Sequence, residues 1–371
     1  EGSARELIEQ AASLAGPPRP GQVHTSPRYI AARFALHDDD LRRARSEFVD
    51  LLAGVGPDAG YDTVHVLRSL VEVVARQGRG REALELAARA TRAASHFHTP
   101  VATTWYIEAL AELVGGTFER AALISSRGVD LAREQGDERY LRRQLAQLGL
   151  ARLHLDELDA AVAAYRELRR IDAASGIRDV TALRWHTDAV TALALVGETD
   201  EAAALLAEVR SAVEAGLGAP GTGIAADRAE AEIAAAEGDL DGARLLVTRS
   251  ATAAAERRLP IEQARSLVAL AHIERRARRT GRSLEAAARA REVRAMTDVL
   301  GLSPLMSFAG SAGSDGDAEH RALDALVRSL VDQRAQARAQ REWARADELR
   351  DQLAAAGVRV EDGPEGSTWS V

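Results

Sequence analysis

Residues 197–216 read GETDEAAALLAEVRSAVEAG, and the fold can be predicted from the element that this stretch contains. Gly197 is followed by four residues and then by Ala202, which begins an apolar pattern with helical period. Because glycine adopts the left-handed conformation that ends many helices, we expect one helix to stop here. Asp200 lies where a carboxylate can cap the next helix or oppose its dipole. The stretch therefore predicts a tight junction between two helices.

The same element returns along the chain at intervals of about 38–43 residues, the range of helix-pair repeats. Gly or Asp stands five residues before an Ala in each of these pairs: Asp39 and Ala44, Gly78 and Ala83, Gly116 and Ala121, Asp156 and Ala161, Gly238 and Ala243, and Gly281 and Ala286. Asp159 and Asp241 correspond to Asp200. One helix pair cannot bury its apolar face alone, so the pairs must stack. We expect an all-α fold, a helix-pair (tetratricopeptide-like) superhelical solenoid over residues 1–290.

The apolar positions within these helices carry small side chains. One unit places alanine at helical spacing, and another uses larger residues in the same pattern: Ala83, Ala87, Ala90 and Ala94, and Ala161, Tyr165 and Leu168. The chain is 46% hydrophobic but only 4% aromatic. Small residues let neighbouring helices approach closely, so this composition favours packed helices over sheets.

This pattern resembles tetratricopeptide-type repeats. The Arg-, Ala- and Leu-rich units, such as LVALAHIERRARRTGRSLEAAARA at 267–290, look more specifically like the sensor arm of large ATP-binding LuxR-type transcription regulators. The resemblance implies that the concave face of the array binds a protein or peptide, or senses an effector. Neither the nucleotide-binding loop nor the DNA-binding motif of those regulators is found in the sequence, so DNA binding does not carry over.

The repeat pattern stops near residue 291. Residues 291–306 predict one more helix, and residues 307–320, rich in Gly, Ser and acid, predict a flexible linker. Residues 321–371 predict a helical segment followed by two short strands. The strands flank Gly363-Pro364-Glu365-Gly366, where Pro and Gly suit a type I turn. We expect a small C-terminal helical domain that ends in a β-hairpin, with Val358, Val360 and Trp369 packing the hairpin onto the helix.

Three motifs in this region resemble one family. They are VRAMTDVLG at 293–301, Arg338-x4-Trp343-x2-Ala-Asp-x2-Arg-Asp, and EDGPEGSTW at 361–369. In order and spacing, they look like the C-terminal anticodon-binding domain of bacterial cysteine–tRNA ligases. The resemblance covers about residues 291–371 and implies that the tail binds the anticodon loop of cysteine tRNA.

The resemblance assigns five tRNA-binding positions: Arg338, Trp343, Asp347, Arg350 and Asp362. Their chemistry suits the implied roles. Carboxylates such as Asp347 and Asp362 can accept hydrogen bonds from a guanine edge, and Arg338 and Arg350 can hold phosphate or base oxygens. Trp343 can stack on an unpaired base, or it can serve only in core packing.

Composition excludes several kinds of chemistry. The 371 residues include no Cys, and all 48 basic residues are Arg, so thiol, Schiff-base and phosphate-loop lysine chemistry are absent. A cysteine–tRNA ligase needs a His-rich adenylate motif, a Lys-rich loop and a Cys-containing zinc site, none of which occurs in the sequence. We therefore expect no enzymatic activity and no cofactor. Residues 291–371 contain ten Arg against fourteen Asp and Glu, so electrostatic attraction to tRNA by the tail alone should be weak.

Three other motifs are interpreted as structural. His96 and His98 form the nearest approach to a metal pair, but positions i and i+2 of a helix face different ways. APGTGIAAD at 219–227 is Gly-rich without a lysine, and we interpret it as a turn between repeat helices. HDDD at 37–40 stands where the other units place their turns.

We therefore expect a non-catalytic helical-repeat scaffold that binds a protein or peptide in its groove and engages cysteine tRNA through its tail. The N-terminus lacks a signal-peptide pattern and no run is long enough to span a membrane, which predicts a cytoplasmic protein. Two alternatives stay open. The chain could be a truncated LuxR-type regulator whose array binds a protein or small effector, or a ligase fragment joined artificially to a regulator fragment.

Overall fold

A computed structural model of the protein describes residues 2–55, 60–97, 101–277 and 289, together with 359–363 and 366–370. The chain divides into two compact units, Glu1–Ala309 and Gly310–Val371. The predicted helices at 291–306 and 321–357 and the predicted linker at 307–320 lie outside the described residues.

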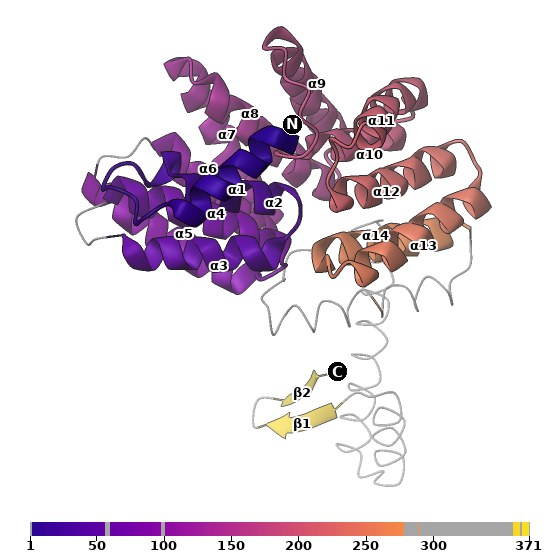
Figure 1. Ribbon diagram of the computed structural model, residues 1–371. Coiled ribbons are helices and arrows are strands. Elements are labelled where there is room, and N and C mark those ends of the chain that lie inside the picture. Colours follow the sequence, from indigo (N-terminus) through magenta and orange to yellow (C-terminus); the bar gives the residue numbers. More distant parts are fainter. Residues whose placement is uncertain are drawn as a thin grey trace. The chain divides into compact units, whose positions relative to one another are not determined.

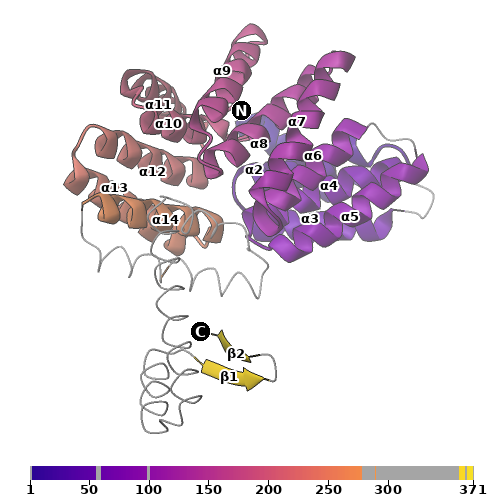
Figure 2. The same ribbon diagram turned by 180° about the vertical axis from the view of Figure 1, so that it is seen from behind.

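The first unit consists, in its described part, of consecutive α-helices joined by short loops (Figure 1). In chain order these elements are α1 (Gly2–Leu14), the 3-10 helix η1 (Val23–Thr25), α2 (Pro27–His37), α3 (Leu41–Gly54), α4 (Gly60–Arg76), α5 (Gly80–Phe97), α6 (Val101–Gly115), α7 (Phe118–Gln135), α8 (Glu138–His154), α9 (Leu158–Ala174), α10 (Trp185–Leu195), α11 (Thr199–Glu214), α12 (Pro220–Ala236), α13 (Leu240–Glu256) and α14 (Pro260–Arg276). Seen from behind, the same helices follow one another as stacked layers (Figure 2). The predicted helix-pair solenoid is confirmed.

Left-handed residues end the first helix of most repeats, as the sequence predicts. Gly78, Gly197 and Gly238 have φ values of 73°, 86° and 94°, and Asp39 and Asp156 adopt 62° and 61°. Asp is among the few non-glycine residues that tolerate this region, which explains why it can replace Gly in the element.

Gly116 does not follow this rule, because its φ lies outside the left-handed region. The atom nearest to a Cβ at Gly116 would be Oε2 of Glu112, the far end of a flexible side chain. The same Glu112 oxygen accepts a hydrogen bond from the backbone N–H of Thr117, at 3.2 Å. Thr117 is the N-cap of α7, and its side chain accepts from the backbone N–H of Arg120.

The N-caps of α9, α11 and α13 are Glu157, Glu198 and Asp239, each two positions before the predicted carboxylate. Asp239 accepts from the backbone N–H of Gly242 at 2.9 Å, and Asp40 caps α3 in the same way. Asp159, Asp200 and Asp241 lie in the first turn of their helices, where they oppose the dipole but do not serve as the N-cap. Of the two predicted roles, opposing the dipole is therefore confirmed for these three residues, and capping is not.

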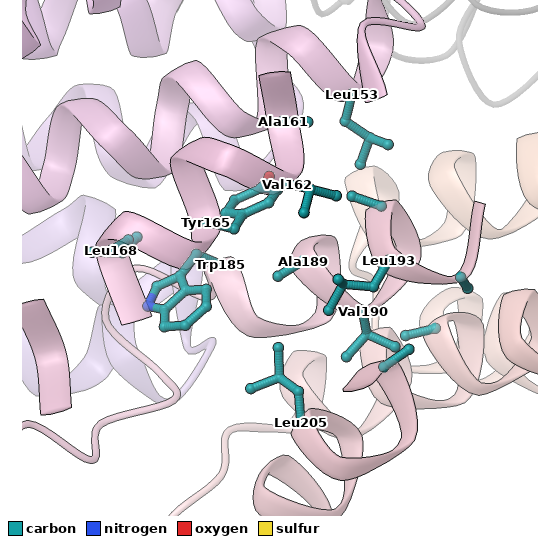
Figure 3. Packing of buried hydrophobic residues seen from close by; sticks show 14 of the residues in the cluster. Leu153, Ala161, Val162, Tyr165, Leu168, Trp185, Ala189, Val190, Leu193 and Leu205 are labelled. Atoms are coloured by element: carbon teal, nitrogen blue, oxygen red, sulfur yellow. The ribbon is translucent and has the colours of Figure 1, made fainter. Parts of the chain in front are cut away.

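The core contains the small residues that the sequence picks out. Ala83, Ala87, Ala90 and Ala94 are 0–5% exposed, and they pack in one cluster with residues of α4 and α6. Around α9, α10 and α11, larger side chains fill the space between helices, as Figure 3 shows for Tyr165, Trp185 and Leu205. The rings of Tyr165 and Trp185 stack with their centroids 6.3 Å apart.

APGTGIAAD is not a turn, which corrects the prediction from sequence. Ala219 is the N-cap of α12, and Pro220 occupies its first turn, so the glycines that follow are helical. Proline fixes a helical φ and lacks the N–H that would be unpaired in the first turn, so Pro here starts a helix.

In the second unit the structure describes two strands, β1 (Arg359–Gly363) and β2 (Gly366–Ser370), paired antiparallel. Gly363 pairs with Gly366 next to the loop, and Val360 lies opposite Trp369. The predicted hairpin is therefore present. Its packing onto a helix concerns side chains outside the described part of the chain.

None of the helices in the described residues combines the length and the apolar character that crossing a membrane requires.

Candidate functional site

The even-numbered helices α4, α6, α8, α10, α12 and α14 surround a cavity of about 180 Å³, which we call the central cavity. The segment 180–184, which leads into α10, forms another part of its wall. Its charged lining residues are Glu72, Arg76, Arg143, Arg184, Asp188, Glu262 and Arg265. Leu110, Leu113, Leu150 and Ile261 add apolar surface between them. A cavity with an apolar wall and a few placed polar groups is typical of binding sites.

Glu72 on α4 is ionised and fully paired. Arg33 forms an ion pair with one carboxylate oxygen, and the hydroxyl of Tyr106 donates to the other at 3.0 Å. Burial raises the pKa of Glu72, but the nearby guanidinium groups of Arg33 and Arg68 lower it more, and the net pKa lies well below its usual value. The carboxylate is thus held in place with both oxygens occupied.

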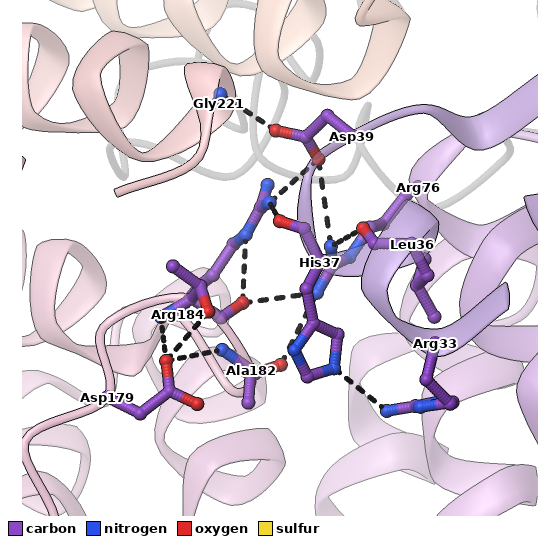
Figure 4. Close-up of polar contacts among 10 residues, drawn as sticks. Arg33, Leu36, His37, Asp39, Arg76, Asp179, Ala182, Arg184 and Gly221 are labelled. Carbon is purple, nitrogen blue, oxygen red and sulfur yellow. Dashed lines mark hydrogen bonds and ion pairs between the residues drawn. The ribbon is translucent and has the colours of Figure 1, made fainter. Parts of the chain in front are cut away.

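A second set of polar contacts joins the beginning of the array to its later repeats (Figure 4). Asp39, with a side chain 3% exposed, accepts from Nη2 of Arg184 at 2.7 Å and from the backbone N–H of Gly221 at 2.8 Å. Nη1 of Arg76 lies 3.6 Å from Asp39. We call these contacts the Asp39 clasp. They connect Asp39 to two residues that lie 145 and 182 positions further along the chain.

Backbone carbonyls complete the clasp. Arg76 donates to the carbonyl of Leu36 at 2.7 Å and to those of Thr181 and Ala182 at 3.3 Å each. Burial and the neighbouring Arg184 lower the pKa of Arg76 to about 9, which leaves it protonated at neutral pH. Two guanidinium groups therefore share one carboxylate at the edge of the central cavity.

On α8, Arg143 and Gln147 are one helical turn apart and both line the cavity. The Arg143 guanidinium lies 5.7 Å from the ring centroids of Tyr106 and Tyr140, and its Nη1 donates to the carbonyl of Arg139 at 3.1 Å. Its buried Nε has no partner among the described residues. Gln147 donates from Nε2 to the carbonyl of Tyr106 at 3.1 Å, while its buried Oε1 is unpaired in that same part of the chain.

The opposite wall has further paired charges. Asp188 on α10 forms an ion pair with Arg265 on α14. Glu262 accepts from Nη1 of Arg228 at 2.8 Å. Thr222 and His186 also line the cavity, and the buried Oγ1 of Thr222 and Nδ1 of His186 have no partner among the described residues. The cavity wall thus presents both fixed ion pairs and unused polar atoms.

The arrangement is suited to binding. No group of three or more His, Asp or Glu residues in the described ranges could hold a metal ion. His96 is exposed on α5, where its Nδ1 donates to the carbonyl of Arg92 at 2.7 Å, and His98 lies outside the described residues.

The structure does not test the predicted tRNA-binding residues. Arg338, Trp343, Asp347 and Arg350 lie outside the described residues, and Asp362 lies on β1, opposite Ser367. Sequence analysis did not identify the residues of the central cavity. The HDDD motif at 37–40 drew attention only as a turn between helices. The contacts of its Asp39 with Arg184 and Gly221 could not be predicted, because those residues lie far along the chain and outside any local sequence pattern.

Comparison with known proteins separates the two parts of the chain. Residues 320–369 match the cysteinyl-tRNA ligase anticodon binding domain family. The cysteine–tRNA ligase of Kocuria rhizophila is 61% identical over 79 residues, which are 21% of this chain and 16% of that ligase. The C-terminal part therefore resembles this anticodon-binding domain, and only a small part of the ligase is matched.

The fold as a whole resembles solved helical-repeat proteins. A Rap protein complexed with competence and sporulation factor has a TM-score of 0.55 and 12% identity, covering 91% of this chain and 98% of that one. NprR in complex with its cognate peptide NprX has a TM-score of 0.53 and 13% identity, covering 88% and 94%. A signal transduction ATPase of Pyrococcus horikoshii with a tetratricopeptide repeat sensor is also similar, with a TM-score of 0.40 and 12% identity, covering 74% and 43%. At such identities the likeness to Rap and NprR concerns the fold alone.

Proposed function

We propose that this protein is a non-catalytic interaction scaffold: its repeat array binds a peptide segment in the central cavity, and its C-terminal module binds cysteine tRNA in the cytoplasm. The observation that carries the first half is the central cavity itself, whose wall combines apolar side chains with charged and polar ones. Such a wall binds ligands by apolar contact and uses a few placed polar groups to orient them.

A peptide fits this wall better than a metal ion or a small apolar molecule. Its backbone offers N–H donors and carbonyl acceptors and its side chains offer apolar surface, and the wall presents both charged and apolar side chains, among them Arg143, Asp188, Leu110 and Leu150. NprR, whose fold this chain shares, was solved with a cognate peptide. That precedent agrees with the proposal but does not identify the sequence that this chain binds.

The groove is tested by selecting binders from a random dodecapeptide phage library on the immobilised full chain. Ala146→Trp places a large ring in the cavity, and Ala163→Trp places the same ring at an exposed position of α9. We expect selected peptides to bind the wild type and Ala163→Trp alike and to lose binding to Ala146→Trp by at least about tenfold. Failure to select any peptide, or equal binding to both variants, would refute the proposal that the central cavity binds a peptide.

The second half of the proposal is supported by the match at 320–369 and concerns five residues. In it Asp347 and Asp362 read base edges, Arg338 and Arg350 hold phosphate or base oxygens, and Trp343 stacks on an unpaired base. The match covers the anticodon-binding domain and none of the catalytic part, so the module holds tRNA without charging it.

This half is tested by titrating the full chain with cysteine tRNA and with an anticodon-swapped transcript at about 50 mM salt, where electrostatic contacts are strong. We expect tighter binding of the cysteine anticodon. Asp347→Asn should reduce this preference, whereas the control Asp351→Asn, with the same charge change nearby, should not. Equal or absent binding of the two transcripts would remove the tRNA assignment.

A further inference from the structure

The cavity wall carries a surplus of positive charge, and Arg143 is its centre. No carboxylate of the described residues lies within 4.0 Å of the Arg143 guanidinium, and its buried Nε–H donates to nothing in that part of the chain. The flat faces of Tyr106 and Tyr140 hold the guanidinium in position. A guanidinium fixed in this way, with free N–H groups, is prepared for an anionic partner.

Glu72 acts on Arg143 electrostatically, but no carboxylate of the described residues forms an ion pair with Arg143. Three carboxylates line the cavity, and each already has a guanidinium partner: Glu72 pairs with Arg33, Asp188 with Arg265, and Glu262 with Arg228. Asp39, at the edge, is shared between Arg76 and Arg184. Together these groups are four carboxylates and six guanidinium groups, those of Arg33, Arg76, Arg143, Arg184, Arg228 and Arg265, so a further carboxylate would reduce the excess of positive charge.

The apolar part of the wall indicates what kind of anion this is. Leu110, Leu113, Leu150 and Ile261 line the cavity together with the charged groups. Burial lowers the pKa of His186 to about 4, so its ring is neutral at pH 7 and does not add positive charge. Inorganic phosphate would gain nothing from the leucine and isoleucine side chains, whereas an acidic peptide side chain brings a carboxylate on an apolar stem.

The size of the cavity sets a limit on the ligand. Its volume of about 180 Å³ is below the roughly 300–1,000 Å³ of pockets that enclose a drug-sized molecule. It therefore holds one or two side chains of a bound segment rather than a whole metabolite. A carboxylate on a short stem, such as that of Asp or Glu, matches this volume.

We propose that the central cavity selects an acidic peptide of a partner protein, whose side-chain carboxylate pairs with Arg143. This inference rests on the proposed function, because it specifies which peptides the groove takes. The same wall excludes basic segments, since a Lys or Arg side chain would face Arg143 without a free carboxylate in the described residues.

The test compares the full chain with two variants in selections from the random dodecapeptide library. Arg143→Met removes the charge and keeps an apolar stem against the two tyrosines. Arg139→Met makes the same charge change at an exposed position of the same helix. We expect Asp and Glu to be enriched at one peptide position with the wild type and with Arg139→Met, and to lose this enrichment with Arg143→Met. Circular dichroism and thermal unfolding confirm that each variant is folded, and Arg143→Lys, which keeps the charge, should retain partial enrichment.

Synthetic peptides then identify the carboxylate. In fluorescence polarisation, replacing the enriched Glu by Gln should weaken binding by at least about tenfold, and amidating the C-terminus should change it by less than about twofold. The reverse result would place a C-terminal carboxylate in the cavity and overturn the side-chain assignment. A peptide of residues 311–320, which contains three carboxylates, serves as competitor. If its inhibition constant is lower than the dissociation constants of the selected peptides, the occupant is a segment of this chain and the partner assignment is wrong.

The outcomes separate this inference from the proposed function. Selected peptides without acidic enrichment, or with enrichment that Arg143→Met leaves unchanged, would overturn the inference and leave the groove standing. If selection yields no peptides at all, both fail.

Discussion

The repeat array and the C-terminal segment resemble their relatives in opposite ways. With a Rap protein the chain shares a TM-score of 0.55 but only 12% identity. With the Kocuria ligase, by contrast, it shares 61% identity over 79 residues. A helix-pair array needs small residues at contact positions and a residue at each junction that can take the left-handed conformation, and many sequences meet these needs. Reading a nucleic-acid loop requires particular side chains at particular places. In the array the fold is therefore shared while most residues differ, whereas in the C-terminal segment the individual residues are shared.

If close packing determines the fold of the array, truncating a buried side chain should lower the free energy of unfolding more than any other kind of substitution. Phe118 on α7 is 2% exposed and stacks on His154, with ring centroids 4.4 Å apart. Phe118→Ala should lower the free energy of unfolding by about 3–5 kcal/mol, because it leaves a cavity in the core. Leu123→Ala, on the same helix but 53% exposed, should change it by less than about 0.5 kcal/mol. Urea unfolding followed by circular dichroism measures both, and similar values for the two variants would contradict packing as the determinant.

The Asp39 clasp should come next, since it is the place where the array depends on particular residues. Asp39→Asn keeps a side chain that tolerates φ near 62° but leaves Arg76 and Arg184 without their shared carboxylate. Removing one member of a buried ion pair costs roughly 3–5 kcal/mol, and because the amide keeps part of the hydrogen bonding we expect about 2–4 kcal/mol. Asp38→Asn, at a side chain 42% exposed, is the matched control and should be nearly neutral. An equal loss in both variants would show that the clasp contributes nothing specific.

Acid should weaken the array in a defined range. Burial and the nearby Arg33 and Arg76 lower the pKa of His37 to about 4, against a usual value of 6.5. The unfolded chain therefore binds a proton at His37 that the folded chain does not, so stability is lost as pH falls from about 6.5 towards 4. Between pH 7 and pH 5 this group should contribute a loss of roughly 1–2 kcal/mol.

His37→Gln should remove only this contribution to the pH dependence, because glutamine can still accept a hydrogen bond from Arg33 but does not titrate. The rest should remain, since burial also lowers the pKa values of His65, His154 and His186. His96→Gln, at an exposed position of α5, should leave the dependence as it is. Thermal unfolding between pH 5 and pH 7 measures both. A steeper slope in His37→Gln than in the wild type would show that the sign of the assignment is wrong.

The same contrast explains what could be predicted from the sequence. The period and the element at Gly197–Ala202 report local helix pairing, so the helices, the buried alanines and most left-handed residues follow from them. Gly116 breaks the rule because its φ is not left-handed; Thr117 caps α7, and Glu112 accepts from the backbone N–H of Thr117, an interaction that depends on a rotamer. Pro220 and its glycines suit a turn and a helix start equally, so the pattern could not separate them.

The central cavity could not be predicted for a different reason. Asp39 meets Arg184 and Gly221 only because the array curves through several repeats, and small rotations between neighbouring pairs add up along the chain. The repeat period gives the spacing of the helix pairs along the sequence, but it does not give the total rotation that accumulates between distant pairs. In the tail the situation is reversed: the motifs identify residues, while the described structure reaches only the hairpin.

The smallest expected effect tests whether the two parts work independently. If the array and the tail are separate modules, Arg143→Met should change the affinity for cysteine tRNA by less than about twofold. Asp347→Asn should likewise change the affinity for peptide by less than about twofold. Both affinities are measured because a coupling free energy between two binding sites is reciprocal. Titrating tRNA with and without a saturating selected peptide measures this directly. A shift of fivefold or more, about 1 kcal/mol, would mean that occupancy of the cavity affects the residues proposed to bind RNA. Peptide affinity measured with saturating tRNA must then shift by the same factor, and a one-sided change would point to a tRNA contact of the array itself rather than to coupling.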